Sequence, residues 1–213
     1  MARNGYGATA FLGGENFWEA YSLATQPARH AILSETATYD KKSGDLRVVI
    51  ETPKGSRNKY DYDPECDCLE LATVLPEGMS FPYDFGFIPS TLGDDGDPLD
   101  VLVLMDAAVV PGCVVRARLI GGIEAKQKEK DGASVRNDRL IAVAIHAQNH
   151  AAAHSLGDLR PHLLHEIKTF FAQYNKMRNR KFKPLSDADA KRAYALVEAG
   201  MRAFEKRARK HKP

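Results

Sequence analysis

Long apolar segments are absent from this chain of 213 residues. No apolar run approaches the roughly 20 residues that a membrane-spanning helix needs, so we do not expect a membrane protein. Residues 1–17 also lack the apolar core of about 7 to 15 residues that secretory signal peptides carry. These absences predict a cytoplasmic protein.

Cysteine is scarce as well, with three residues at Cys66, Cys68 and Cys113. Three thiols leave one unpaired in any pairing scheme, and a bridge between Cys66 and Cys68 would close a very small, strained loop. We therefore expect reduced structural thiols, which fits a cytoplasmic location.

The net charge is small, at +2, but it is unevenly distributed. Five cations gather near the end of the chain and leave the remainder net acidic: Lys206, Arg207, Arg209, Lys210 and Lys212. We interpret them as a solvated helix end, where cations also suit the helix dipole. A nucleic-acid binder that uses this basic tail is a weaker alternative, because carboxylates on the predicted barrel would repel phosphates.

The pattern of apolar residues predicts strands first and helices later. Period-two alternation and short apolar runs between Gly, Pro and Asp turns predict strands at 46–52, 59–62, 66–75, 101–105, 114–121 and 140–147. Residues 124–138 are expected to form a polar loop. Helical spacing predicts helices at 159–178 and 187–209, the second with a capping box of Ser186 and Asp189.

These elements predict a mainly β fold with flanking α, in which two C-terminal helices pack outside a small barrel. We expect one domain over residues 45–213. An N-terminal extension with a short helix is expected to precede it, over residues 1–44.

The densest chemistry lies in the acidic turn, DDGDPLD at residues 94–100. Two ionised carboxylates about 5 Å apart repel by roughly 3 kcal/mol at an effective dielectric of about 20, so converging aspartates need a cation or protons. Oxygen ligands without nearby His or Cys favour Mg²⁺, with Mn²⁺ or Ca²⁺ as alternatives. An ordinary acidic surface turn explains the segment equally well. An EF-hand does not, because Gly96 is third rather than sixth from Asp94.

Other polar groups matter only if the fold brings them to this turn. Glu51 lies near the end of one strand, and Lys59 and Asp61 alternate around Tyr60, so both point from one face of the next strand. Ionised groups inside a barrel are costly unless they form a polar site, whereas each alone is explained as a surface residue. Tyr174 offers a phenol to an anion, although an amphipathic helix explains it too.

Histidines recur at intervals of four, at His146, His150 and His154. This spacing permits a metal site on a helix. We favour a solvated surface, because such spacings often arise without a metal and no carboxylate lies close by in the sequence.

Five segments in succession resemble the soluble family I inorganic pyrophosphatases: VVIETP, KYDYD, FGFIPSTLGDDGDPLDVLVL, LIAVA and FFAQYNK. The resemblance extends over residues 45–183, and DGDPLD is its specific signature. It implies an OB-like five-stranded β-barrel with flanking helices. It also implies an Mg²⁺-dependent hydrolase that splits pyrophosphate into two phosphates with a metal-activated water, with Mn²⁺ as an alternative ion, and a homo-oligomer.

The resemblance also implies roles by position. The implied metal ligands are Glu51, Asp61, Asp95, Asp97 and Asp100. Asp97 matches the aspartate that orients and deprotonates the attacking water. The implied phosphate-binding residues are Lys59, Arg139 and Tyr174. Asp61 stands where the family usually has Glu, and Arg139 where it usually has Lys.

The chain departs from the family pattern at several of these positions. Thr73 replaces an arginine, Phe85 a tyrosine, Asn137 a metal-binding aspartate and Asn175 a lysine. Asp138 is an alternative carboxylate for Asn137, and Lys176 or Arg178 are alternative cations for Asn175. These replacements leave two further hypotheses open: a catalytically impaired binding or scaffold protein, and a hydrolase of another phosphorylated substrate.

Overall fold

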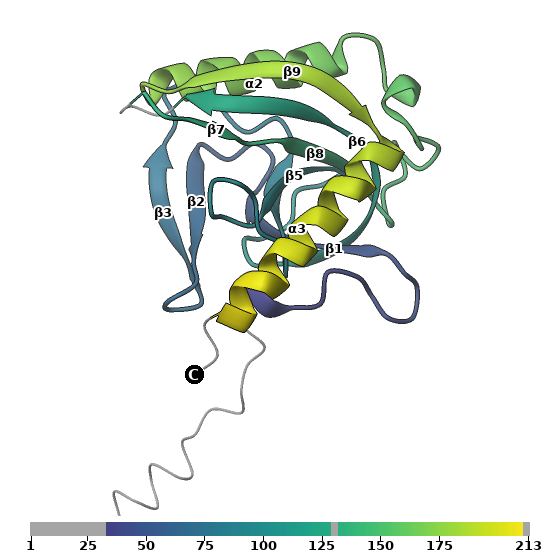
Figure 1. The fold of residues 1–213 in the computed structure, drawn as a ribbon. Helices are drawn as coiled ribbons and strands as arrows, with labels where there is room; N and C mark the ends of the chain where they lie inside the picture. Colours follow the sequence, from purple (N-terminus) through teal and green to yellow (C-terminus); the bar gives the residue numbers. More distant parts are fainter. Residues whose placement is uncertain (1–32, 129–131, 211–213) are drawn as a thin grey trace, which may run out of the picture. The chain divides into compact units, whose positions relative to one another are not determined.

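The computed structural model describes residues 33–128 and 132–210. Five strands close into a ring, in the order β1 (Leu46–Thr52), β4 (Asp84–Ile88), β5 (Leu99–Leu104), β8 (Arg139–Ala144) and β6 (Val114–Lys128). The last strand, β6, pairs back with β1 and so completes the ring (Figure 1). Neighbours are antiparallel except β5 and β8, which run parallel. The closed ring confirms the predicted mainly β, OB-like fold.

The remaining strands lie outside this ring. β2 (Asn58–Asp63) and β3 (Cys68–Val74) form a separate two-stranded hairpin. β7 (Ser134–Arg136) and β9 (Lys181–Asp189) both pair with the far half of β6. Short 3-10 turns occur at η1 (Leu33–Glu35) and η2 (Leu156–Asp158).

Two helices follow, as predicted. α2 (Leu163–Met177) packs along β9, and α3 (Ala190–Lys210) packs against β6 and β9. Figure 1 shows α3 crossing the sheet diagonally. No helix in the described residues is both long and apolar enough to cross a membrane.

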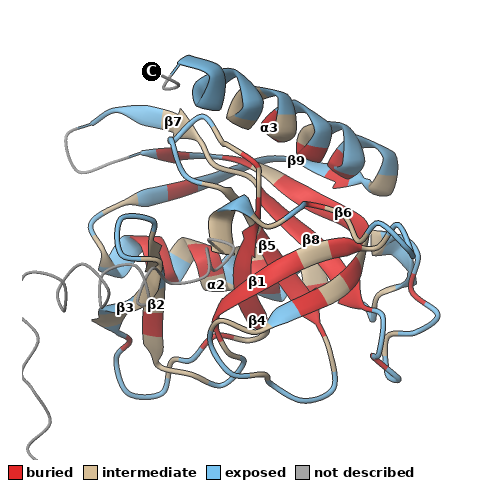
Figure 2. Ribbon diagram, turned by 90° about the horizontal axis from the view of Figure 1, so that it is seen from below, coloured by how far each residue is buried: buried red, intermediate tan, exposed pale blue. Residues whose placement is uncertain are grey.

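The core fills the ring and the space under the helices. Every residue of β4 and β8 is buried, and Figure 2 shows the buried residues concentrated on the ring strands, while the outer face of α3 is exposed. Gly86 allows β1 and β4 to approach each other closely, because a Cβ at this position would lie 1.9 Å from the carbonyl oxygen of Val49. Strands buried on both faces lose the period-two signal, which explains why the sequence analysis did not predict β4.

Two strand predictions failed on the polar side of the fold. Much of the polar loop predicted at residues 124–138 is strand, because β6 continues to Lys128 and pairs with β7 at Ser134–Arg136. β9 was not predicted because its sequence is polar and contains Pro184, which is tolerated here at the sheet margin. Strands near solvent need no apolar alternation when backbone pairing fixes their position.

The predicted capping box of the last helix was wrong. Ser186 belongs to β9, where its hydroxyl donates to Glu124 Oε2 at 2.7 Å. Asp189 caps the helix alone, since its carboxylate accepts a 2.7 Å hydrogen bond from the Arg192 amide. The predicted helix of the N-terminal extension falls largely on residues 1–32, which lie outside the described residues.

Candidate active site

One cavity of about 880 Å³ gathers every side chain that the sequence predicted for the site. β1 supplies Glu51, and β2 supplies Lys59 and Asp61. The acidic turn and the start of β5 supply Asp95, Asp97 and Asp100, while β8 supplies Arg139 and α2 supplies Tyr174. The fold thus brings together residues from five separate segments.

The acidic turn is held firmly against its surroundings. Gly96 adopts a φ of +94°, which is readily accessible only to glycine, and so lets the chain reverse between two aspartates. The Gly93 amide donates to the Asp97 carbonyl at 2.7 Å. The Leu99 amide donates to Thr91 Oγ1 at 3.0 Å. The turn therefore presents its carboxylates from a fixed backbone.

Lys59 is the central cation of the cavity wall. Its ammonium lies 3.1 Å from Glu51 Oε2 and 2.6 Å from Asp61 Oδ1. Burial raises the pKa of Glu51 to about 7, despite the nearby ammonium. Burial also acts to lower the pKa of Lys59, but Glu51 and Asp61 together hold it above its ordinary value. Lys59 stays charged and compensates two carboxylates.

The aspartates of the turn repel one another. Burial, followed by the charge of Asp100, raises the pKa of Asp95 to about 6. Burial and then Asp61 raise the pKa of Asp97. Burial raises the pKa of Asp100 as well, although the adjacent Arg139 opposes the shift. Such upward shifts mark a site with a deficit of positive charge, which a bound cation would remove.

Arg139 is buried beneath the aspartates. Its guanidinium hydrogen-bonds to the carboxylate of Asp100 and to the side-chain oxygen of Asn137. Aromatic rings surround it, with centroids 5.2 Å away at Phe171 and 5.9 Å away at both Phe85 and Phe182. These contacts fix the orientation of the guanidinium toward the cavity.

Three of the four replaced positions lie in or beside the cavity, and the structure shows what their side chains contact. The ring of Phe85 packs under two cations, with the Lys59 ammonium 5.2 Å from its centroid. Asn175 is buried and its amide donates to the Phe171 carbonyl at 2.9 Å. Asp138 does not replace Asn137, because its carboxylate pairs with Arg136 and accepts the Ala125 amide at 2.9 Å.

Three arginines add charge to the cavity, and the sequence analysis missed two of them. Arg178, Arg180 and Arg207 all line it. Arg178, one of the two cations proposed in place of Asn175, hydrogen-bonds to the Tyr174 hydroxyl, and its guanidinium lies 5.4 Å from the ring centroid. Lys176, the other, is exposed.

Arg207 is exposed, in agreement with our interpretation of the basic tail as a solvated helix end, but it also borders the cavity. It lines the cavity together with Phe204 and Ala208, which lie three residues before it and one residue after it. The spacing of three and four that runs through Val197, Met201 and Phe204 extends to Arg207 and Ala208. Continuing this periodicity would have placed Arg207 on the same side of the helix as these residues.

The carboxylates fit hard divalent ions. All of their donors are oxygens, as Mg²⁺ and Mn²⁺ prefer. Within the described residues, no three of these carboxylates place their oxygens within 4.8 Å of one another. This spread suits ions that keep several water ligands and take only one or two carboxylates each.

The histidines do not contribute to this site. His146, His150 and His154 lie in turns and loops after β8 rather than on a helix. In the part of the chain that the structure describes, none of them belongs to a cluster of metal-ligating side chains. The prediction of a solvated surface agrees with the exposure of His146 and His154.

Comparison with known proteins identifies the family. The family model described as inorganic pyrophosphatase matches residues 48–205. An inorganic pyrophosphatase from a Nostoc species is 38% identical over 164 residues, which cover 77% of this chain and 94% of that protein. One from Thermus thermophilus is 40% identical over 153 residues, covering 72% and 85%.

Solved structures agree with the sequence matches. The crystal structure of inorganic pyrophosphatase from Thermus thermophilus aligns with a TM-score of 0.75 at 34% identity, covering 82% of this chain and 99% of that one. The Helicobacter pylori enzyme aligns with a TM-score of 0.71 at 34% identity, covering 80% and 99%. Because the family model spans the ring, the acidic turn and most of α3, this chain belongs to the inorganic pyrophosphatase family.

Proposed function

We propose that this chain hydrolyses inorganic pyrophosphate to two phosphates and uses Mg²⁺ as its cofactor. The observation that carries the proposal is the single cavity in which clustered carboxylates face clustered cations. Pyrophosphatases of this family use divalent metal ions. The oxygen donors of this cavity favour Mg²⁺ among them, with Mn²⁺ as an alternative.

We assign the metal-binding role to Glu51, Asp61, Asp95, Asp97 and Asp100, which share the cavity wall. Divalent ions bound there would neutralise the charge of pyrophosphate and make a water molecule more acidic. Burial is the main cause of the raised pKa values of Glu51 and Asp95, and they support the assignment because a bound cation would stabilise the ionised forms of these carboxylates.

Asp97 is the proposed catalytic residue. Its carboxylate accepts a hydrogen bond from the attacking water, orients it toward phosphorus and takes its proton. The position supports this role, because Asp97 is on the tight turn between Asp95 and Asp100 and lines the cavity. The Gly93 amide donates a 2.7 Å hydrogen bond to the backbone carbonyl of Asp97. This bond fixes the backbone that carries the carboxylate, so the carboxylate can orient the water.

Lys59, Arg139 and Tyr174 are the proposed phosphate-binding residues. Lys59 and Arg139 are held in place by their carboxylate partners, so little conformational freedom is lost when they bind an anion. Arg178 extends the cationic wall next to Tyr174 and supplies the charge that Asn175 lacks. The cations bind the oxygens of the leaving phosphate and stabilise the charge that develops on them.

A phosphate-release assay with Mg²⁺ and pyrophosphate tests the proposal. Asp97→Asn should lower kcat by about 10² to 10⁴, the usual contribution of a general base. Asp94→Asn is the matched control, since Asp94 belongs to the same turn but not to the cavity lining. Unchanged turnover in Asp97→Asn would exclude the assigned mechanism.

The replacements at Phe85 and Asn137 favour a second candidate, a relative that binds pyrophosphate without hydrolysing it. Calorimetry that detects pyrophosphate binding in Mg²⁺, together with no phosphate release, would support this candidate over the first. The same assay with other phosphate esters tests a third possibility, that the chain hydrolyses another phosphorylated compound. Faster release from an ester than from pyrophosphate would identify another phosphorylated compound as the substrate.

We also propose a cytoplasmic homo-oligomer. The free thiols of Cys66, Cys68 and Cys113 support a reducing compartment. The exposed side chains of Leu71 and Val110, which are 56% and 72% accessible, support association between copies. Light scattering on the eluting protein tests assembly, and a monomeric mass would contradict it.

A further inference from the structure

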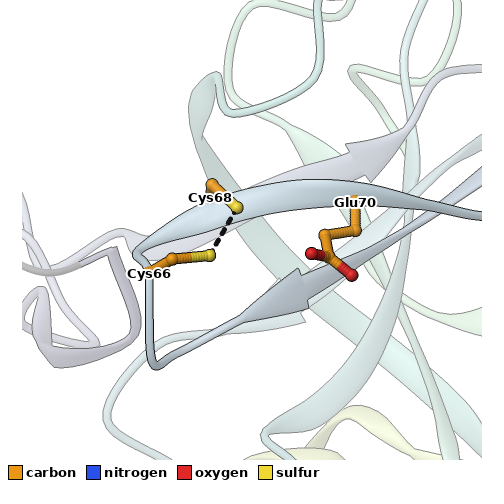
Figure 3. A group of neighbouring side chains, drawn as sticks. All are labelled: Cys66, Cys68 and Glu70. Atoms are coloured by element: carbon orange, nitrogen blue, oxygen red, sulfur yellow. Dashed lines mark hydrogen bonds between the residues drawn. The ribbon is translucent and has the colours of Figure 1, made fainter.

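A second group of metal-ligating side chains lies outside the cavity, at the end of the β2–β3 hairpin. Cys66, Cys68 and Glu70 each place one ligand atom within 4.8 Å of the other two. The two sulfur atoms are 2.7 Å apart. Figure 3 shows both thiols at the hairpin turn, with the Glu70 carboxylate beside them on β3. No other group of this kind occurs among residues 33–128 and 132–210.

The pairing of the hairpin explains why these side chains meet. Cys68 and Glu70 are two residues apart on β3 and therefore share a face. Asp63 lies directly opposite Cys68 in the register of the two strands. Residues directly opposite in an antiparallel pair also share a face. The Asp63 carboxylate accepts a 2.7 Å hydrogen bond from the Glu65 amide, and this bond, followed by one from the Cys66 thiol, lowers the pKa of Asp63.

The turn that carries Cys66 is itself anchored. Asp67, between the two cysteines, has a φ of +50°, an unusual conformation for a residue other than glycine. Its carboxylate accepts a 2.7 Å hydrogen bond from the Tyr62 hydroxyl and a 3.0 Å hydrogen bond from the Leu33 amide. These bonds hold the turn in the conformation that turns both thiols to the same side.

The donor atoms differ in kind from those of the cavity. Two sulfurs with one carboxylate suit Zn²⁺ and similar thiophilic ions, whereas Mg²⁺ prefers oxygen alone. Cys66 and Glu70 are exposed, so an ion reaches them directly from solvent. We propose that Cys66, Cys68 and Glu70 bind a thiophilic divalent cation such as Zn²⁺, with Asp63 or a water as the fourth ligand. Each thiol releases its proton to solvent as its sulfur bonds to the metal.

The position of this thiol site on the hairpin gives it a structural consequence. The ion would join the turn after β2 to the start of β3, and β2 carries Lys59 and Asp61 into the cavity. Asp61 is paired directly with Glu70. The two carboxylates therefore share a face of the hairpin, but none of Cys66, Cys68 and Glu70 lines the cavity. The thiol site is distinct from the cavity and would stabilise the strand that supplies two residues to it.

Cobalt provides a spectroscopic test. The reduced, metal-free full chain is titrated with Co²⁺ in excess Mg²⁺, which competes for the oxygen ligands of the cavity. We expect a sulfur-to-cobalt charge-transfer band that saturates at one ion per chain and disappears when Zn²⁺ is added. Carboxylates do not produce this band, so the result does not depend on whether the cavity catalyses hydrolysis. No band in the full chain would overturn the proposal.

Substitutions locate the site. The double variant Cys66→Ser/Cys68→Ser should lose the band, and Glu70→Gln should weaken Co²⁺ binding by about tenfold or more. Cys113→Ser is the matched control, because Cys113 lies outside the group and should leave the band unchanged. A band that persists in the double variant, or disappears in Cys113→Ser, would overturn the assignment.

A measurement on the unmodified protein guards against misfolded variants. Zn²⁺ should slow the alkylation of Cys66 and Cys68 by iodoacetamide, with the modified residues identified by mass spectrometry. The rate at Cys113 should not change. Equal rates at Cys66 and Cys68 with and without Zn²⁺ would overturn the proposal.

Discussion

The guanidinium of Arg207 donates a 3.1 Å hydrogen bond to the carbonyl oxygen of Gly96, 111 residues earlier in the chain. This bond joins the last turns of α3 to the acidic turn. The Leu92 amide makes a second connection, to the Gly200 carbonyl at 3.0 Å. α3 therefore supports the segment that presents Asp95 and Asp97 to the cavity.

Arg207→Ala should weaken the binding of both metal and substrate. The substitution removes a cation from the cavity and releases the carbonyl of Gly96. Since Arg207 is exposed, solvent screens this contact to about 1 kcal/mol or less, and we expect the KM for pyrophosphate to rise by about twofold to fivefold. Steady-state kinetics over a range of Mg²⁺ concentrations measures the change.

Arg209→Ala is the control for that experiment. Arg209 is on the same helix, but its side chain is 82% exposed and pairs with Glu205 at 3.8 Å. Removing it should leave the kinetics unchanged. Equal effects from Arg207→Ala and Arg209→Ala would mean that only the overall charge of the helix matters.

Arg178→Met should raise the KM for pyrophosphate more than it lowers kcat. Arg178 holds the hydroxyl of Tyr174 and lines the cavity. The substitution removes a charged contact to the substrate, and we therefore expect pyrophosphate to bind about tenfold more weakly. Lys176→Met serves as the comparison, because Lys176 is exposed in the last turn of α2, two residues before Arg178. A larger effect from Lys176→Met would show that the charge Asn175 lacks is supplied by Lys176.

Asn137→Asp should lower the Mg²⁺ concentration that gives half-maximal activity. Asn137 lines the cavity next to Arg139, so a carboxylate there adds an oxygen ligand with a full charge. We expect about a tenfold change in this concentration. The corresponding free energy is far smaller than the attraction between an isolated ion and a carboxylate, because the new carboxylate would also interact with Arg139. Asn149→Asp, on an exposed loop, controls for net charge. An unchanged or higher Mg²⁺ requirement would contradict the prediction.

Much of the site was predictable because its residues follow short, local patterns. The acidic turn carries its own signature, and alternation along β2 places Lys59 and Asp61 on one face. Arg180 and Arg207 were not predicted, because their role depends on where α2 and α3 end relative to the cavity. Only the packing of the helices on β6 and β9 determines that position.

The strands also divide into those that their own sequence predicts and those that depend on the rest of the fold. β1 matches its predicted bounds at both ends, because its apolar run is bounded by turn residues. β4 was missed because it is buried on both faces, and β9 because its partner β6 fixes it through backbone pairing. A strand that is buried on both faces lacks the alternation of apolar and polar residues, and so does a polar strand held by backbone pairing near solvent. A sequence prediction of strands depends on that alternation.

Glu124 joins three elements on the outside of the ring, remote from the acidic turn. Its carboxylate accepts hydrogen bonds from Ser186 Oγ at 2.7 Å, Arg192 Nε at 2.9 Å and Arg136 Nη2 at 2.6 Å. The Ser186 hydroxyl, followed by Arg192 and Arg136, lowers the pKa of Glu124 from 4.5 to about 2. The ionised form is therefore favoured by folding, and it contributes stability above its unfolded pKa.

Glu124→Gln should reduce the free energy of unfolding by about 1 to 3 kcal/mol at pH 7, because β7, β9 and α3 lose a shared anion. The Glu124 side chain is only 15% exposed, but Arg192 is 52% exposed, so solvent screens part of these contacts and keeps the loss well below the sum of three charged hydrogen bonds. The deficit should shrink as the pH falls below 4.5 toward 2, where Glu124 takes up a proton in the parent protein as well. Urea unfolding at a series of pH values measures both quantities. Glu198→Gln is the control, since its exposed pair with Arg202 spans 3.7 Å. A deficit that stays constant across this pH range would show that Glu124 acts through its shape rather than its charge.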